Sequence, residues 1–182
     1  RTISVQADTL NFSSGAAGGN TTLTTQVDTA NVNLSGTAAT ANLTLNNTGA
    51  LTASLHAANG NITASATGTL NVSAAAGGNN RSIDLSSQQG DIAFGTIDAG
   101  LANGTIIMSA AQGSLLGAGT DLTANSLDLT SFNGIGAQNA GFMTSACNLK
   151  ANVLGTGGIY VDGTGPLTLG RVATADGSIA IT

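Results

Sequence analysis

The chain has 182 residues and a formal net charge of −5, and Gly, Ala, Ser and Thr supply 98 of its residues. Only four residues are basic, too few to neutralise a run of phosphates, so the composition excludes nucleic-acid binding. One Cys and one His exclude an internal disulfide and a zinc site of the usual type. No apolar stretch reaches the roughly 20 residues that a membrane-spanning helix needs.

Short runs of alternating apolar and polar residues recur along the chain, and a period of two predicts β-strands. The runs cover 3–7, 23–27, 31–35, 42–46, 61–65, 70–74, 82–86, 91–95, 126–130, 148–153, 159–161, 167–169 and 178–182. We expect corners at Gly- and Asn-rich pairs between the runs, because these residues tolerate positive φ and close backbone approach. The segments assigned to corners are Gly18-Gly19, Asn46-Asn47, Gly77 to Asn80, and Gly157-Gly158.

A longer period underlies these runs. The first large apolar residue of every second strand recurs at intervals of 19 to 23 residues, in two interleaved series. The first series is Leu43, Ile62, Ile83, Ile106, Leu127 and Leu149, and the second is Leu51, Leu70, Ile92, Leu115 and Ile135. Two strands per coil, repeating about every 21 residues, indicate a parallel β-helix. A third short strand per coil is expected around Leu34, Leu55 and Leu122.

The sequence therefore predicts an all-β parallel β-helix, or β-solenoid, that spans residues 1–182 as one domain of roughly nine coils. Leu, Ile, Val and Ala would stack in a narrow core, and the four Phe residues would fill its wider parts: Phe12, Phe94, Phe132 and Phe142. Both chain ends read as strands, and an uncapped solenoid end is an open sheet edge. We expect axial stacking near Ile3 and Ile179, on further copies or on a continuing chain.

The repeat style is similar to that of a known family. GNITASATGTLNVSA (60–74), GDIAFGTIDAG (90–100) and the segment 122–170 resemble repeats of filamentous-haemagglutinin-like exoproteins, the large bacterial adhesins exported by two-partner secretion. The resemblance covers about 42–182, and 1–41 match more loosely. It implies a right-handed parallel β-helix, a place outside the cell or on the bacterial surface, and a host or cell-surface glycan or protein as receptor. The family's NPNL and NPNGI motifs are missing, so the chain resembles a stalk or repeat region.

Candidate reactive groups are scattered. All nine acidic residues are Asp, and β-helix enzymes that act on polysaccharides build their sites from clustered Asp with Arg or Lys. Asp84 and Asp128 lie 44 residues apart, which places them two coils apart on one face. A carbohydrate-acting enzyme would instead need a second cluster to meet in one groove, namely Asp98, Asp121 and either Arg81 or Arg171. We favour solvated or turn-capping Asp, with no catalytic residues, no cofactor and no metal; the GGxGxD calcium array is missing.

Single residues have ordinary interpretations. His56 fits a surface or corner position, and Cys147 fits a small buried apolar position beside a strand. Nine of the 18 Asn start an Asn-X-Ser/Thr triplet, which arises when an outward Asn and an outward Ser or Thr flank an inward residue. Strand alternation is favoured over glycosylation as the cause.

The leading hypothesis is a non-enzymatic extracellular β-helix that forms the stalk or fibre of a bacterial adhesin-like protein. The alternatives are a carbohydrate-acting β-helix enzyme and an ice- or glycan-binding solenoid. A regular face of outward Thr would favour ice binding, but the predicted outward positions mix Thr with Asn, Ser, Asp and Lys.

Overall fold

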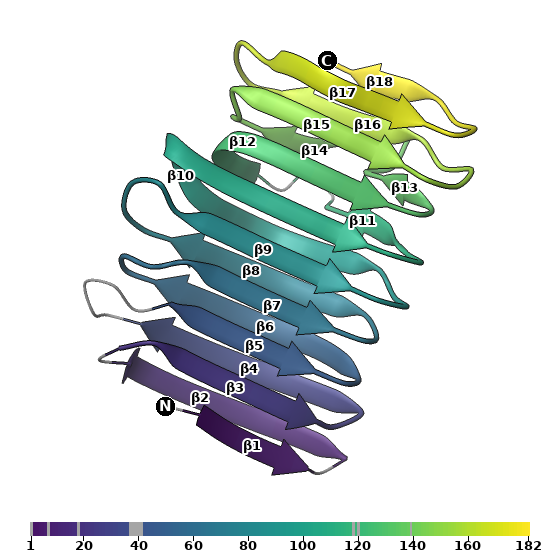
Figure 1. Ribbon diagram of the computed structural model, residues 1–182. Coiled ribbons are helices and arrows are strands. Elements are labelled where there is room, and N and C mark those ends of the chain that lie inside the picture. The colour runs from purple at the N-terminus through teal and green to yellow at the C-terminus, as the bar shows by residue number, and fades with distance from the viewer. Residues whose placement is uncertain are drawn as a thin grey trace.

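The computed structural model describes residues 2–6, 8–17, 19–36, 42–117, 119, 121–138 and 140–182, and the side chains of 2–6, 11 and 13–17 lie outside this description. In this part of the chain there are eighteen β-strands and no helix. The strands wind into a parallel β-solenoid of about eight turns with about 21 residues per turn (Figure 1). The predicted fold class is therefore confirmed, with about eight turns where roughly nine were expected from the length.

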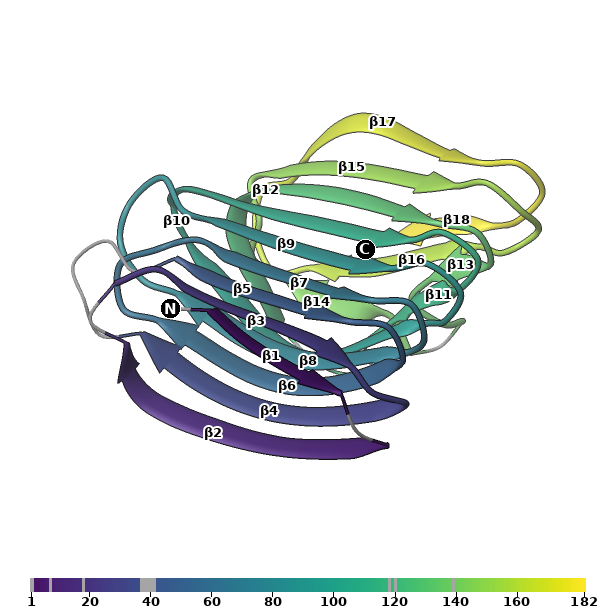
Figure 2. The same cartoon turned by 60° about the horizontal axis from the view of Figure 1, so that its bottom comes forward.

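Each turn contributes to two walls that face each other across the core (Figure 2). The first wall consists of β1 (Thr2–Gln6), β3 (Thr21–Gln26), β5 (Leu43–Asn47), β7 (Ile62–Ala66), β9 (Ser82–Ser87), the later parts of β10 (Ile92–Ala110) and β12 (Asp121–Ser131), β15 (Asn148–Val153) and β17 (Thr168–Thr174). The second wall consists of β2 (Thr9–Ala17), β4 (Thr29–Gly36), β6 (Ala50–Ala57), β8 (Leu70–Ala76), the early parts of β10 and β12, β11 (Ser114–Leu116), β13 (Gly134–Ile135), β14 (Phe142–Thr144), β16 (Ile159–Gly163) and β18 (Ile179–Ile181).

The strand register confirms both predicted series. In the first wall Leu43 pairs with Ile62, and Ile62 with Ile83, and the column continues to Leu149. In the second wall Leu51 pairs with Leu70, and the column continues to Ile135. Every pair is parallel, so each turn repeats the inward positions of the one before and stacks apolar side chains into a continuous core.

The third predicted strand is part of the second wall in the early turns. Leu34 pairs with Leu55 inside β4 and β6, and the same column reaches Leu122 through Ala74 and Ile97. The second wall is split in the later turns, where β11 ends at Leu116 and β12 begins at Asp121, and where β13 and β14 are separate strands. A broad, unbroken second wall therefore exists only from β2 to β10.

The aromatic residues are only partly where they were predicted. Phe94 and Phe142 are buried, and their rings meet edge to face with centroids 5.5 Å apart. Phe12 is half-buried and packs against the core. Phe132 was wrongly predicted as a core residue, since it is 46% exposed. The preceding Ser131 takes the inward position at the end of β12, which turns the next side chain outward.

Corner residues were also predicted unevenly. The segments 77–80 and 157–158 lie between strands as expected, whereas Gly18 lies outside the described residues. Asn46 and Asn47 were wrongly assigned to a corner, because both belong to β5. The Asn47 side chain points inward and is buried, and its amide is bonded to the backbone at Val27 and Ala50. It secures the turn from inside the core, which is why the strand extends this far.

Candidate functional site

The outer face of the second wall carries a shallow trough. A hollow of about 590 Å³ is lined by Phe12, Asn31, Val32, Asn33, Thr52, Ala53, Ser54 and Ser73. A second hollow of about 290 Å³ is lined by Thr52, Ala53, Asn71, Val72, Ser73, Ala93, Phe94 and Gly95. The two hollows share Thr52, Ala53 and Ser73, so they form one depression that crosses the strands of the broad wall. We call this depression the neutral trough.

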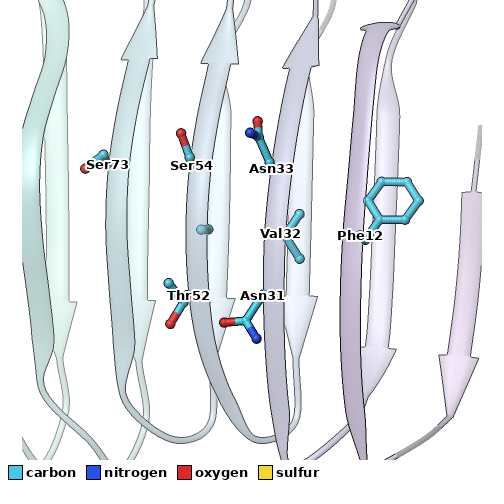
Figure 3. A pocket seen from close by; sticks show the side chains of 8 residues that line it. Phe12, Asn31, Val32, Asn33, Thr52, Ser54 and Ser73 are labelled. Atoms are coloured by element: carbon cyan, nitrogen blue, oxygen red, sulfur yellow. The ribbon is translucent and has the colours of Figure 1, made fainter.

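Strand register builds the trough from two rows of outward side chains. One row follows the pairs Asn31–Thr52–Asn71–Ala93, and the other follows Asn33–Ser54–Ser73. Figure 3 shows the first two members of the first row and the whole second row on neighbouring strands, with Val32 between Asn31 and Asn33. Neighbouring strands are about 4.8 Å apart, and alternate residues of one strand are about 6.7 Å apart. The two rows are therefore about 7 Å apart along each strand, measured between backbone positions, and extend about 19 Å from β2 to β10.

The floor of the trough is the least covered part of the core. Val32, Ala53, Val72 and Phe94 are 4 to 5% exposed, whereas Leu51 and Leu70 in the adjacent column are fully buried. At the far end Gly95 takes the place of a side chain, and a Cβ there would lie 2.4 Å from the Ser73 hydroxyl oxygen. The glycine therefore leaves room for that hydroxyl beside the floor.

The polar side chains of the trough are available to a ligand. All six are exposed, and five of them make no side-chain hydrogen bond with any described residue: Asn33, Thr52, Ser54, Asn71 and Ser73. Neither hollow is lined by Asp, Lys, Arg or His. The nearest outward titratable group in this wall is His56, two residues beyond Ser54 in β6. The trough is thus electrically neutral and rich in groups that donate and accept hydrogen bonds.

Some polar residues outside the trough form hydrogen bonds between neighbouring turns. In the first wall Ser65 donates a hydrogen bond to the side-chain oxygen of Asn46, 2.7 Å away. At the corner before the first wall, successive Asn side chains accept a backbone N–H from the next turn, in the order Asn20 from Asn42, Asn42 from Asn61, and Asn61 from Ser82. These groups are used within the chain, which distinguishes them from the trough.

The acidic residues do not gather into the groove that an enzyme would need. Asp98 pairs in register with Thr123, and Asp121 pairs with Met143, so the two carboxylates occupy different rows. Asp98 accepts the N–H of Gly100, and Arg81 donates to the side-chain oxygen of Asn59. Arg171 lies far along the chain in β17. Within the described residues no three potential metal-binding side chains come together.

Asp84 and Asp128 share one row of the first wall, as their spacing predicted. Ile107 lies between them in register, so they are separated by a full turn. Desolvation by partial burial raises the pKa of Asp84 above its ordinary value of 3.8. Asp128 and Lys150 are register neighbours beside a small hollow of about 140 Å³.

The single His and Cys both lie on the surface. His56 is exposed on β6, which confirms its predicted position. Cys147 was wrongly predicted as buried, since it is a free, exposed thiol. It precedes β15 at a corner, where the backbone bonds to Asn125 and Thr168 and the inward positions belong to Ala146 and Leu149.

The Asn-X-Ser/Thr triplets show the predicted alternation. Asn71 and Ser73 are exposed on either side of buried Val72, and exposed Asn42 and half-buried Thr44 flank buried Leu43. The triplet at 71–73 also spans the trough from one row to the other. Strand geometry thus accounts for these triplets, as predicted, without glycosylation as their cause.

The last turn exposes inward positions. Leu169 and Ile179 follow Leu149 and Ile159 in register, yet they are 50% and 46% exposed whereas their predecessors are fully buried. β17 pairs with β15, and β18 pairs with β16, and the described part of the chain supplies no strand on their far side. At the other end Ile3 pairs with Leu23, and its side chain lies outside the description.

The fold and its faces define a parallel β-solenoid with a neutral trough on its second wall. Among the described residues there is no helix that could cross a membrane. The chain matches no family model, no curated protein sequence and no solved structure. The features that bear on its function are therefore its surface and the ends of the solenoid.

Proposed function

We propose that the protein is a non-enzymatic rod that forms the stalk or fibre of an adhesin-like protein outside the bacterial cell. The continuous stacking of the turns supports this function. Each inward column is repeated from turn to turn, and parallel backbone ladders join every turn to the next. A stacked array of this kind is a stiff rod whose length grows with the number of turns.

The exposed last turn supports an axial neighbour. Leu169 and Ile179 present large apolar side chains at the end of the core, beside strand edges that have free backbone groups. A further turn, from a second copy or from a continuing chain, would bury those side chains and pair those edges. The resemblance to filamentous-haemagglutinin-like repeats agrees with such a neighbour and with a place at the bacterial surface.

The rival enzymatic function has weaker support. It would draw on Asp98 and Asp121, which lie in different rows and have no arginine paired with them in the described part of the chain. We therefore keep hydrolysis or lysis of polysaccharides as the second hypothesis. Activity on a panel of polysaccharides that is abolished by Asp121→Ala would establish it and would contradict the rod proposal.

Electron microscopy and analytical ultracentrifugation of the purified chain test axial association. We expect end-to-end assemblies that lengthen with concentration and that Leu169→Arg disrupts, because a charge would then occupy the apolar end. Leu101→Arg is the matched control, because Leu101 is 52% exposed in β10, which has turns on both sides. A chain that stays single at high concentration would exclude stacking of separate copies, and equal disruption by both variants would contradict the role of the end.

A further inference from the structure

We propose that the neutral trough binds a neutral oligosaccharide lying across β4, β6 and β8. The inference deepens the proposed adhesin-like function and rests on it, because it names the class of receptor that the rod would hold. It is carried by the rows of exposed Asn, Ser and Thr side chains and by the lack of charge between them.

The hydrogen-bonding chemistry fits sugar hydroxyls. Each sugar hydroxyl donates one hydrogen bond and accepts others, and so do the amides and hydroxyls of the trough. Thr52 and Ser54 stand on opposite sides of Ala53 at the middle of the depression, and both side chains are exposed and unbonded within the described residues. A sugar seated over Ala53 could therefore be held from both sides, with the apolar floor below its C–H groups.

The absence of charge selects the class of sugar. A uronate, sulfate or phosphate group would lose part of its hydration on binding. No cation of the trough would offset that loss, because neither hollow is lined by Lys, Arg or His. Two rows about 7 Å apart can contact the two edges of one sugar chain that lies over them, and a length of about 19 Å spans a few units. The trough therefore favours a short stretch of an uncharged glycan.

The same surface is poorly suited to a protein ligand. A peptide could add a strand only to an open edge, and β4, β6 and β8, which carry the polar rows, are each paired on both sides. Protein interfaces also depend on anchoring Trp, Tyr or Arg side chains, and none of these lines either hollow. The ring of Phe94 is buried in the core and is not available as an anchor.

The chain provides a closely matched control. The sequence Thr-Ala-Ser occurs at 52–54 in the trough and again at 63–65 in β7 of the first wall. In both places the Thr and Ser point outward around a buried Ala. The double variants Thr52→Val/Ser54→Ala and Thr63→Val/Ser65→Ala thus remove the same atoms from opposite walls.

Binding to immobilised hexasaccharides tests the proposal. The probes are neutral hexamers of glucose, mannose, galactose and N-acetylglucosamine, with a hexamer of galacturonic acid as the charged counterpart, measured by biolayer interferometry on the full chain. We expect at least one neutral hexamer to bind, and the trough variant to weaken that binding at least fivefold. We expect the first-wall variant to change it less than twofold, and the galacturonate hexamer not to bind.

Three results would overturn the inference: no response to any neutral hexamer, equal or stronger binding of the galacturonate hexamer, or equal loss of binding in both double variants. Circular dichroism shows whether each variant is folded, and single substitutions Thr52→Val and Ser54→Ala replace the double variant if it is not. Electron microscopy of the trough variant separates this inference from the proposed rod. End-to-end assemblies that persist without glycan binding would reject the trough alone, and assemblies that are absent while binding persists would reject the stacking of separate copies alone.

Discussion

Asn47 offers the sharpest test of how the core secures its corners. Its side-chain oxygen accepts the hydroxyl of Thr25 at 2.9 Å and the N–H of Val27 at 3.2 Å, and its amide nitrogen donates to the carbonyl of Ala50 at 2.8 Å. Thr25, Val27 and Asn47 are 0%, 2% and 5% exposed. One side chain therefore joins two turns at a place that water hardly reaches.

Asn47→Ala should lower the free energy of unfolding by about 3 kcal/mol, since a buried donor or acceptor left without a partner costs about 1–3 kcal/mol. The Val27 N–H and the Ala50 carbonyl each lose the partner that Asn47 supplies. The Thr25 hydroxyl keeps a second acceptor, the carbonyl of Asn46 at 3.1 Å, so it adds little to the loss. The loss of about 3 kcal/mol therefore counts two groups, the buried N–H of Val27 and the carbonyl of the half-buried Ala50.

Asn46→Ala is the matched control, because it removes the same side chain from the neighbouring outward position. It breaks one partly exposed hydrogen bond with Ser65, which should cost about 1 kcal/mol or less. Urea unfolding followed by circular dichroism gives the two costs, and hydrogen exchange at Val27 reports the local opening of the corner. Equal costs for both variants, or an unchanged exchange rate at Val27 in Asn47→Ala, would refute the reasoning.

Three further predictions concern packing and charge. Gly113→Ala should lower the melting temperature clearly, because its Cβ would lie 2.2 Å from the carbonyl oxygen of Gly90, whereas Gly165→Ala, with open space around it, should shift it little. Phe142→Ala should cost about 3–5 kcal/mol in urea unfolding, because it deletes a fully buried ring, and a cost below 1 kcal/mol would contradict the packing. Because the raised pKa of Asp84 lets the folded state keep a proton that the unfolded chain loses, stability should fall as pH rises from about 3.8 through the folded-state pKa. Asp84→Asn should therefore stabilise the protein at pH 7 but not at pH 3 in parallel urea titrations, and equal effects at both pH values would contradict this.

The period could be predicted because large apolar residues mark it. Leu43, Ile62 and Ile83 are adjacent in one column, and their spacing alone identified that column. β6 was marked only by Leu51 and Leu55 and was missing from the alternating runs, because its inward positions include Ala53 and Ala57, and alanine inside a narrow core looks like alanine in a loop. Where inward residues are small, the composition hides the strand although its backbone ladder is complete.

The corners were harder to predict because turns in this fold vary in how they close. β10 runs for 19 residues from the second wall into the first, through Gly100 and Asn103 at positive φ. Elsewhere a buried side chain such as Asn47 or Ser131 closes the corner from inside. A polar residue next to a turn can therefore either lie in the corner itself or point inward and close the corner from the core. Only the strand register shows which of the two a given residue does.

The sequence contains the residues of the trough, but only the strand register shows that they lie side by side. The triplet Asn71-Val72-Ser73 contains both rows and the floor between them, and strand alternation explained it correctly. Alternation alone could not show that Thr52 and Asn33 extend those rows in the turns before, at distances of 19 and 40 residues. It also could not show that the side chains of Asn46 and Ser65 are bonded to each other whereas those of Thr52 and Asn33 have no partner among the described residues, because that depends on the contacts between turns.

The trough ends where the wall loses its regularity, and this limits the ligand. The row that begins with Asn31 and Thr52 continues through Ala93 to Leu116, which is apolar and 39% exposed. The register also shifts between Phe94 and Ile97, and the second wall splits after β11. A ligand can therefore follow the neutral rows for only a few sugar units, and one chain would bind it weakly.

If rods stack end to end as we propose, one trough recurs per chain along the fibre, and many weak contacts would act together on a surface coated with glycans. The rod would then supply the spacing and the trough the specificity, so adhesion should depend steeply on fibre length even though each site keeps the same affinity.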